Sequence, residues 1–337
     1  MSLYTANEDG LIHEFPEKQL NLSVDGIEIH KNILTLQECK HLQNMLYHYL
    51  EEISSNQPNP FKLNQPRTYK LIYDYFPTRK LLLQNFSFGH NPMSWYVRCH
   101  EKVQEKFAQI YGIEQSTISN NNQKNGLVTS FDGVSIIPPC EQTRMGWHEG
   151  VSKLHCDQSF SNPFFQCVQG QVPIFDVRKG DATLRVLRGS HLLHADFAEA
   201  FHLTNNPNEW TALTEQQIQW YRDRLDEDAD VYVQCPKGSL VLWDSRTIHD
   251  GTKPQKWRSE SNWRCTLFVC MKPRINDNEI AKKRENAFQW RRNTTHDPNK
   301  VKLFPIHPRT YGRQCIPPKT IKLEDYGLSL EKIQSLV

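Results

Sequence analysis

Apolar residues in the first part of the chain recur at helical spacing. From about 36 to 56 they follow a Thr35-x-x-Glu38 capping box, which predicts an amphipathic helix. A second helix is predicted over 91–112, where a proline occupies the first helical position, which tolerates it. The aromatic stretch 69–76 between the two helices is β-prone.

The pattern then changes to short β-prone runs separated by turn residues. The change follows a polar loop at 119–126, which is rich in asparagine. One interruption, 195–226, has helical character and contains the capping box Thr214-x-x-Gln217. A further helix is predicted over 278–292, before an irregular tail. The eight β-prone runs are 127–137, 153–157, 164–175, 182–188, 231–235, 239–243, 247–249 and 263–271.

Eight short strands of this kind are typical of a two-sheet jelly roll. We therefore expect a mainly β protein with added helices. Its core would be a double-stranded β-helix of the cupin type, with helices on its N-terminal and C-terminal sides. The expected division is an N-terminal extension (1–28), a main domain (29–274) and a C-terminal helix and tail packed on the same domain (275–337). Within the main domain the jelly-roll core covers about 127–271 and the helical insert about 195–226.

Charge and cysteine usage narrow the classes of partner. Lys plus Arg (40) nearly equals Asp plus Glu (38), so no net field favours a nucleic acid or an anionic membrane. The N-terminus is polar and acidic, and no run approaches the ~20 apolar residues of a membrane span. The nine cysteines are scattered without a C-x-x-C pair, as in a reducing compartment. A cytoplasmic protein is expected, with a small molecule rather than a nucleic acid as its partner.

Three residues could form a metal site. In His155-x-Asp157 both side chains would lie on one face of a strand, because side chains alternate with period 2. His249 follows a later strand and a short turn, so a neighbouring strand could bring it to the same point. Two imidazoles and one carboxylate leave three octahedral positions open, which suits Fe(II) that binds a co-substrate and dioxygen. A His-x-Asp spacing alone is more often a surface hydrogen-bond pair.

A basic residue for a co-substrate follows the third candidate ligand. Arg264 and Thr266 share one face of the next strand, so they could hold the distal carboxylate of 2-oxoglutarate. The alternative for Arg264 is an ion pair with a surface acid. Arg258 competes for the same role, although it lies in a polar loop where a solvated position is favoured.

Longer stretches around these residues resemble a known family. Gly180 to His191 is similar to a family stretch G-x-L-x-V-x-P-G-S-H, and Pro236 to His249 is similar to the segment that leads to its distal iron histidine. With 29–53 and the tail 282–296, the likeness is to the phytanoyl-CoA dioxygenase-like branch of the Fe(II)/2-oxoglutarate oxygenases. Two positions depart from the pattern: Arg188 replaces the usual proline, and Leu154 a frequent tryptophan.

The resemblance implies a chemistry for these residues. His155, Asp157 and His249 would bind Fe(II), while Arg264 with Thr266, or Arg258, would hold 2-oxoglutarate. Dioxygen and 2-oxoglutarate would then be consumed to hydroxylate a C–H bond of a small or lipid-like molecule. An aspartate at 157 argues against a halogenase, which has a small residue there. The alternatives are a non-catalytic metal-binding jelly roll and an oxygenase that acts on a protein or nucleic acid.

Overall fold

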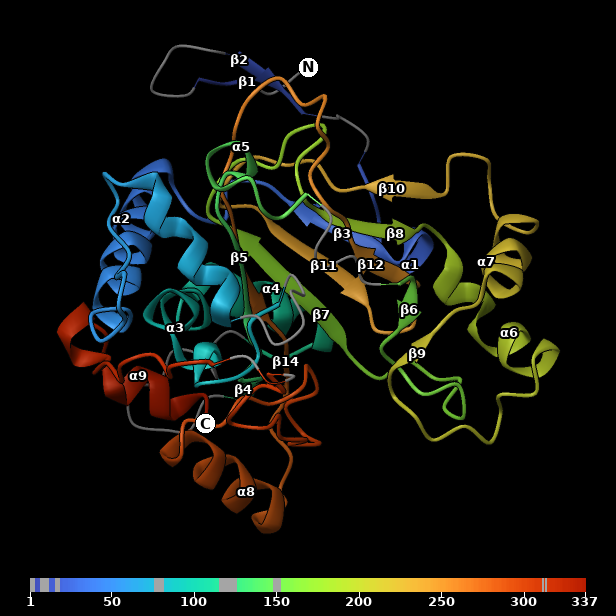
Figure 1. Cartoon of the computed structure of the whole chain (residues 1–337). Coiled ribbons are helices and arrows are strands. Elements are labelled where there is room, and N and C mark those ends of the chain that lie inside the picture. Colours follow the sequence, from blue (N-terminus) through green and yellow to red (C-terminus); the bar gives the residue numbers. More distant parts are fainter. Residues whose placement is uncertain are drawn as a thin grey trace.

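Two antiparallel sheets of five strands each form the centre of the computed structural model (Figure 1). The structure describes residues 4–6, 12–15, 19–75, 82–114, 126–147, 153–310, 312 and 314–337. The first sheet has the order β3 (Ile27–His30), β11 (Leu240–Asp244), β7 (Val168–Pro173), β13 (Arg264–Val269) and β5 (Val134–Ile137). The second has the order β10 (Asp230–Tyr232), β8 (Leu184–Leu187), β12 (His249–Gly251), β6 (His155–Cys156) and β9 (Thr211–Ala212).

The two sheets enclose a common apolar core, which confirms the jelly-roll prediction. Val241 and Trp243 of β11 meet Leu184 and Val186 of β8 there. The alternate residues of β11 point to the other side of the sheet, into the core beneath the N-terminal helices. Because both faces of β11 are covered, all five of its residues are buried, and the strand appears in the sequence as a continuous apolar run.

Two short pairs of strands accompany the main sheets. They are β1 (Tyr4–Ala6) with β2 (Ile12–Glu14), and β4 (Leu127–Thr129) with β14 (Met271–Pro273). The predicted runs 127–137 and 263–271 are thus each divided between two strands. Strand β9, which lies at the edge of the second sheet beside β6, was not predicted at all.

Helices from the N-terminal part of the chain cover the outer face of the first sheet (Figure 1). They are α2 (Leu36–Ile53), α3 (Pro92–Arg98) and α4 (Glu101–Tyr111). The predicted capping box of α2 is present, with Thr35 and Glu38 each bonded to the other's backbone nitrogen. The single helix predicted over 91–112 is instead interrupted at Cys99 and His100. There the Arg98 carbonyl accepts from the Gln104 side chain at 3.0 Å.

The prediction of β structure over 69–76 was wrong. Residues Pro66–Tyr75 form the 3₁₀ helix η1. Tyr69, Ile72 and Tyr75 are buried at intervals of three residues, which is the repeat of a 3₁₀ helix, so these three side chains share one face; Tyr73 is buried beside them. Residues 76–81 lie outside the described part of the chain, as does most of the asparagine-rich loop.

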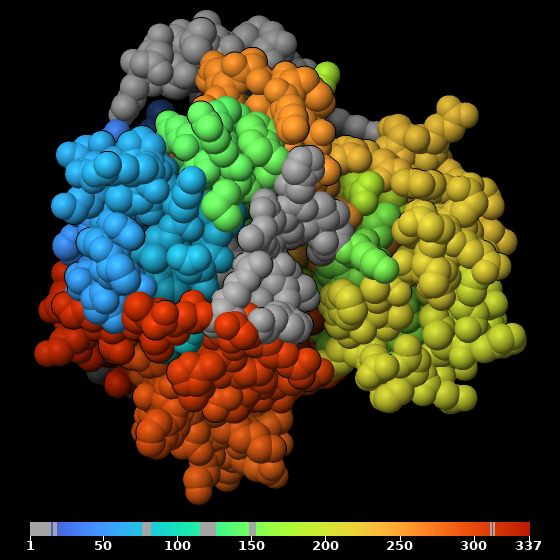
Figure 2. Space-filling view, in the orientation of Figure 1, coloured from blue at the N-terminus to red at the C-terminus, as the bar shows by residue number. Residues whose placement is uncertain are grey.

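The helical insert covers the outer face of the second sheet. Its helices α6 (His194–Ala200) and α7 (Glu215–Arg222) form a separate apolar cluster with residues of β6 and β8, and the Thr214/Gln217 capping box is confirmed. Figure 2 shows the insert in yellow, opposite the N-terminal helices, with the C-terminal segments in orange and red below. The remaining helices are α1 (Leu22–Asp25), η2 (Phe88–His90), α5 (Cys140–Thr143), η4 (Ser190–Leu193), α8 (Asn278–Gln289), η5 (Glu324–Tyr326) and α9 (Leu330–Ser335).

None of the helices in the described residues combines the length and apolar character that a membrane crossing requires.

Candidate metal centre

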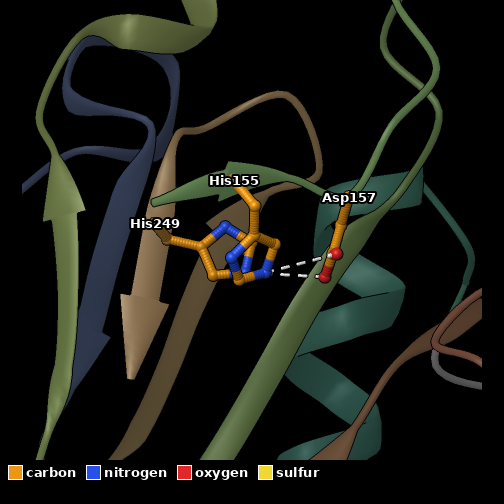
Figure 3. Close-up of side chains that lie close together, drawn as sticks. All are labelled: His155, Asp157 and His249. Atoms are coloured by element: carbon orange, nitrogen blue, oxygen red, sulfur yellow. Dashed lines mark ion pairs between the residues drawn. The ribbon is translucent and has the colours of Figure 1, made fainter. Parts of the chain in front are cut away.

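Adjacent strands of the second sheet bring His155 and His249 together. The two residues are direct partners in the antiparallel pairing of β6 with β12, and their ring centroids are 4.4 Å apart. Asp157 follows His155 by two residues and faces the same point. Nε2 of His155 lies 3.4 Å from Oδ1 of Asp157, and Nε2 of His249 lies 3.5 Å from Oδ2 (Figure 3).

Backbone carbonyls fix the orientation of both rings. Nδ1 of His155 is 2.8 Å from the Lys153 carbonyl oxygen, and Nδ1 of His249 is 2.9 Å from that of Thr247. Since a carbonyl only accepts, each Nδ1 must carry the proton in the neutral ring. Each Nε2 therefore presents its lone pair to the space beside Asp157, as a metal ligand requires.

The short strand β12 is held from both ends. Thr247 donates to the carbonyl of Gly26 at 2.9 Å, and a Cβ at Gly26 would come within 2.6 Å of the Thr247 hydroxyl. At the next residue after His249, Asp250 accepts two hydrogen bonds from Arg185 of β8, at 3.0 and 2.6 Å. These contacts fix the backbone on either side of the His249 imidazole.

Burial and charge set the protonation of His155 and Asp157. Burial and the neighbouring His249 lower the pKa of His155 to about 4, so its ring is neutral at pH 7. Burial opposes ionisation of Asp157, but His155, His249 and His296 outweigh it and hold the pKa of this carboxyl well below its usual range. The site thus offers the neutral imidazole of His155 and the carboxylate of Asp157, with Nε2 of His249 beside them.

This donor set fits a divalent non-haem metal. One ligand atom from each of His155, Asp157 and His249 lies within 4.8 Å of the others, and among the described residues no other such group of His, Cys, Asp or Glu occurs. Two histidines and one carboxylate form the facial triad typical of Fe(II) oxygenases, with positions left for a co-substrate and dioxygen.

Arg264 lies at the start of β13, where its side chain and that of Thr266 share the inner face of the first sheet. Its Nε donates to the hydroxyl of Ser135 at 3.1 Å and its Nη1 to the carbonyl of Ala182 at 2.7 Å. Both acceptors are neutral, and no carboxylate of a described residue forms an ion pair with Arg264. Burial lowers the pKa of its guanidinium to about 10.

Arg258 is engaged differently. It donates to both carboxylate oxygens of Glu141, at 2.8 and 2.6 Å, and to Asp181 at 3.0 Å. Its side chain is only 4% exposed, so the solvated position expected from the sequence is wrong. Two carboxylates already balance its charge.

Several nearby polar residues have structural roles. His191 is directed to the Ser23 carbonyl at 3.1 Å and takes no part in the His–Asp–His group. Gln158 donates to the carbonyls of Asn162 and Phe164 at 2.7 and 2.8 Å, which folds the loop after Asp157.

Sequence reasoning missed two residues beside the site. Trp210 precedes β9, and the pairing of β9 with β6 brings its ring centroid to 5.6 Å from that of His155. Its side chain is 55% exposed. Nothing in the local sequence marks this tryptophan, because only the edge pairing of β9 places it there.

The other missed residue is His296, in the C-terminal tail. Its Nδ1 is 3.9 Å from Oδ2 of Asp157. Burial would lower the pKa of His296, but the thiol of Cys167 and the carboxylates of Asp157 and Asp132 outweigh it and raise that pKa above its usual value. The tail resembled family sequences, but no signal in it indicated a contact with Asp157.

Comparisons with known proteins identify similar sequences and folds. Residues 90–258, just over half of the chain, match the profile of the family described as Phytanoyl-CoA dioxygenase (PhyH). "Ava biosynthesis cluster protein O" of Aspergillus versicolor is 23% identical over 230 residues, covering 66% of this chain and 68% of that protein. A crystal structure from Salmonella typhimurium LT2, described as an oxidoreductase, covers 94% of this chain and 81% of its own with a TM-score of 0.55 at 12% identity. The structure of EctD from S. alaskensis with 2-oxoglutarate and 5-hydroxyectoine has a TM-score of 0.46 at 12% identity, covering 75% and 73%.

Proposed function

Because the chain belongs to the phytanoyl-CoA dioxygenase family, whose members are non-haem oxygenases that use Fe(II) and 2-oxoglutarate, we propose that it hydroxylates a C–H bond of a small or lipid-like molecule. The observation that carries the proposal is the convergence of His155, Asp157 and His249, with both Nε2 lone pairs facing the carboxylate. These three residues are the proposed Fe(II) ligands. When bound, the iron and 2-oxoglutarate supply the oxidising chemistry, in which dioxygen is consumed and succinate and carbon dioxide are released.

The protein's own contribution is position and charge. The carbonyls of Lys153 and Thr247 accept from Nδ1 of His155 and His249, which leaves the Nε2 atoms of both rings for a metal. We assign the distal carboxylate of 2-oxoglutarate to Arg264, with the Thr266 hydroxyl on the same strand face. The assignment is supported by the lack of an ion pair at Arg264 among the described residues, whereas Arg258 already has Glu141 and Asp181.

Trp210 supports an apolar or planar substrate. Trp210 is 55% exposed, and contact between its apolar surface and water is unfavourable in free energy. The exposed indole lies against His155, a proposed metal ligand. A substrate that covers the indole would recover that free energy at the point where its C–H bond must be held. For an accepted substrate, Trp210→Ala is expected to raise KM and to release succinate without an equal amount of hydroxylated product.

The test is spectroscopic. Under anaerobic conditions, Fe(II) with 2-oxoglutarate should give a metal-to-ligand charge-transfer band in the wild-type protein, and His155→Ala should abolish it. His202→Ala is the matched control, since His202 is exposed in the helical insert and should leave the band unchanged. A wild-type protein without the band, or a His155→Ala variant that keeps it, would refute the proposed site. Iron binding without consumption of 2-oxoglutarate under dioxygen would instead favour a non-catalytic protein.

A further inference from the structure

The number of oxygens through which Asp157 binds a metal decides how many coordination positions stay open. Three residues of a facial triad leave three of six positions open, and 2-oxoglutarate with dioxygen needs all three. If Asp157 bound the metal through both oxygens, it would take one of these positions. A carboxylate is kept to one metal bond when its second oxygen accepts a hydrogen bond from the surrounding protein.

Neither oxygen of Asp157 has such a donor within the triad. His249 approaches Oδ2 at 3.5 Å with Nε2, but the Thr247 carbonyl holds the proton of that ring on Nδ1. The His249 Nε2 therefore has a lone pair and no proton to donate to Oδ2. Oδ1 is the oxygen nearest His155, at 3.4 Å.

His296 is the described residue that can supply the donor. Its Nδ1 lies 3.9 Å from Oδ2, about 1 Å beyond a charge-assisted hydrogen bond. The ring donates from Nδ1 either as the imidazolium or as the neutral tautomer with its proton there. Its other nitrogen, Nε2, is buried and makes no hydrogen bond of ordinary geometry within the described residues, although the Cys167 side chain interacts with the ring.

The backbone around His296 is fixed on both sides. The Thr294 hydroxyl accepts from the backbone nitrogen of Phe131 at 2.9 Å, and the Thr294 nitrogen donates to the Phe131 carbonyl at 3.0 Å. On the other side the Asp297 carboxylate, 1% exposed, accepts from Gln166 at 3.0 Å and from Lys272 at 3.2 Å. These contacts fix the backbone of residues 294 and 297, and the imidazole of His296 is thereby held beside the metal site.

We propose that His296 is a positioning residue which donates from Nδ1 to Oδ2 of Asp157, leaves Oδ1 to the metal, and so preserves the third open coordination position. This inference rests on the proposed function, because it presumes a metal on the triad. His296 lies in the C-terminal tail, beyond residue 258, at which the family match ends.

Two amide variants provide a matched test. Asn places its amide nitrogen where Nδ1 of histidine lies, whereas the amide of Gln corresponds to Nε2. With Fe(II) saturating and dioxygen excluded, the 2-oxoglutarate dissociation constant is titrated from the charge-transfer band. His296→Gln should weaken 2-oxoglutarate binding by about 10- to 100-fold, taking as a guide the range by which the loss of such a hydrogen-bond partner lowers metal affinity or activity. His296→Asn should bind it nearly as well as the wild-type protein.

Wild-type affinity in His296→Gln, or equal losses in the two variants, would overturn the inference. Should His296→Gln fail to fold, a structure of the wild-type protein with Mn(II) and 2-oxoglutarate decides. A hydrogen bond from Nδ1 to Oδ2 supports the inference, and Asp157 bound through both oxygens contradicts it. A wild-type protein that gives no charge-transfer band refutes the proposed function instead, so the two failures are distinguishable.

Discussion

Replacing each of the two competing arginines by methionine should separate co-substrate binding from stability. The lowered pKa of Arg264, about 10 instead of 12.5, corresponds to a cost of about 3 kcal/mol for keeping its charge in the folded protein. Arg264→Met removes that cost but also loses the hydrogen bonds to Ser135 and Ala182, worth about 1 kcal/mol each. The free energy of unfolding of the metal-free protein should therefore stay within about 1 kcal/mol of wild type.

The same substitution should be severe for 2-oxoglutarate. Two charge-assisted hydrogen bonds to its distal carboxylate are worth about 3 kcal/mol or more, so the dissociation constant should rise at least ~100-fold. Arg258→Met should do the reverse, because it leaves Asp181 and Glu141 without their partner. It should destabilise the protein by about 3 kcal/mol, with 2-oxoglutarate affinity unchanged in the folded fraction.

Urea unfolding measures the stabilities, and anaerobic titration of the charge-transfer band measures the affinities. The reasoning fails if Arg264→Met loses several kcal/mol of stability while it binds 2-oxoglutarate normally. It fails equally if Arg258→Met is stable and loses its affinity for 2-oxoglutarate, since Arg258 would then be the residue that holds it.

Three further predictions concern the scaffold. Thr35→Ala removes half of the capping box of α2 and should lower the urea midpoint by the equivalent of about 1 kcal/mol; an unchanged midpoint would contradict the assigned cap. Burial lowers the pKa of His90 from 6.5 to about 3, so between these values the unfolded chain binds a proton that the folded protein does not. The free energy of unfolding is therefore unaffected by this group above pH 6.5 and falls by up to about 5 kcal/mol as the pH is lowered toward 3. His90→Gln should therefore flatten the fall of thermal stability over this pH range, and an equally steep fall would count against it. Arg284→Met deprives four carbonyls, among them that of Val337, of their donor and should cost about 3 kcal/mol or more in urea unfolding, whereas a wild-type midpoint would show that this anchor is dispensable.

Local patterns in the sequence predicted most of the fold. The two capping boxes, the helix 36–56 and nearly all core strands follow from spacing over a few residues, and the structure confirms them. The division of the chain into 1–28, 29–274 and 275–337 stays a prediction. The error at 69–76 arose because the aromatic, β-prone composition of this stretch was taken to indicate a strand, whereas the buried Tyr69, Ile72 and Tyr75 recur at the three-residue repeat of a 3₁₀ helix.

The candidate site was predictable to the extent that it is local. His155 and Asp157 share a face because of strand alternation, and Arg264 with Thr266 for the same reason. Trp210 and His296 were missed because pairing between distant segments brings them to the site. Their immediate neighbours in sequence have the composition of ordinary loops, so no local rule could mark them.

The proposed metal and co-substrate sites carry charges of opposite sign, on Asp157 and Arg264. At the triad, Asp157 is ionised, and within the described residues only histidines form ion pairs with it. At β13, Arg264 is charged, and the acceptors that it has within the described residues are neutral. A divalent cation would balance the Asp157 carboxylate, and a dicarboxylate would balance the Arg264 guanidinium. The lowered pKa of Arg264 means that its charge costs stability in the ligand-free protein, and a bound dicarboxylate would return that stability in proportion to its affinity. Arg258 shows that this part of the fold can pair a buried arginine with carboxylates. The absence of such a partner for Arg264 among the described residues therefore favours the proposed co-substrate site over a purely structural role.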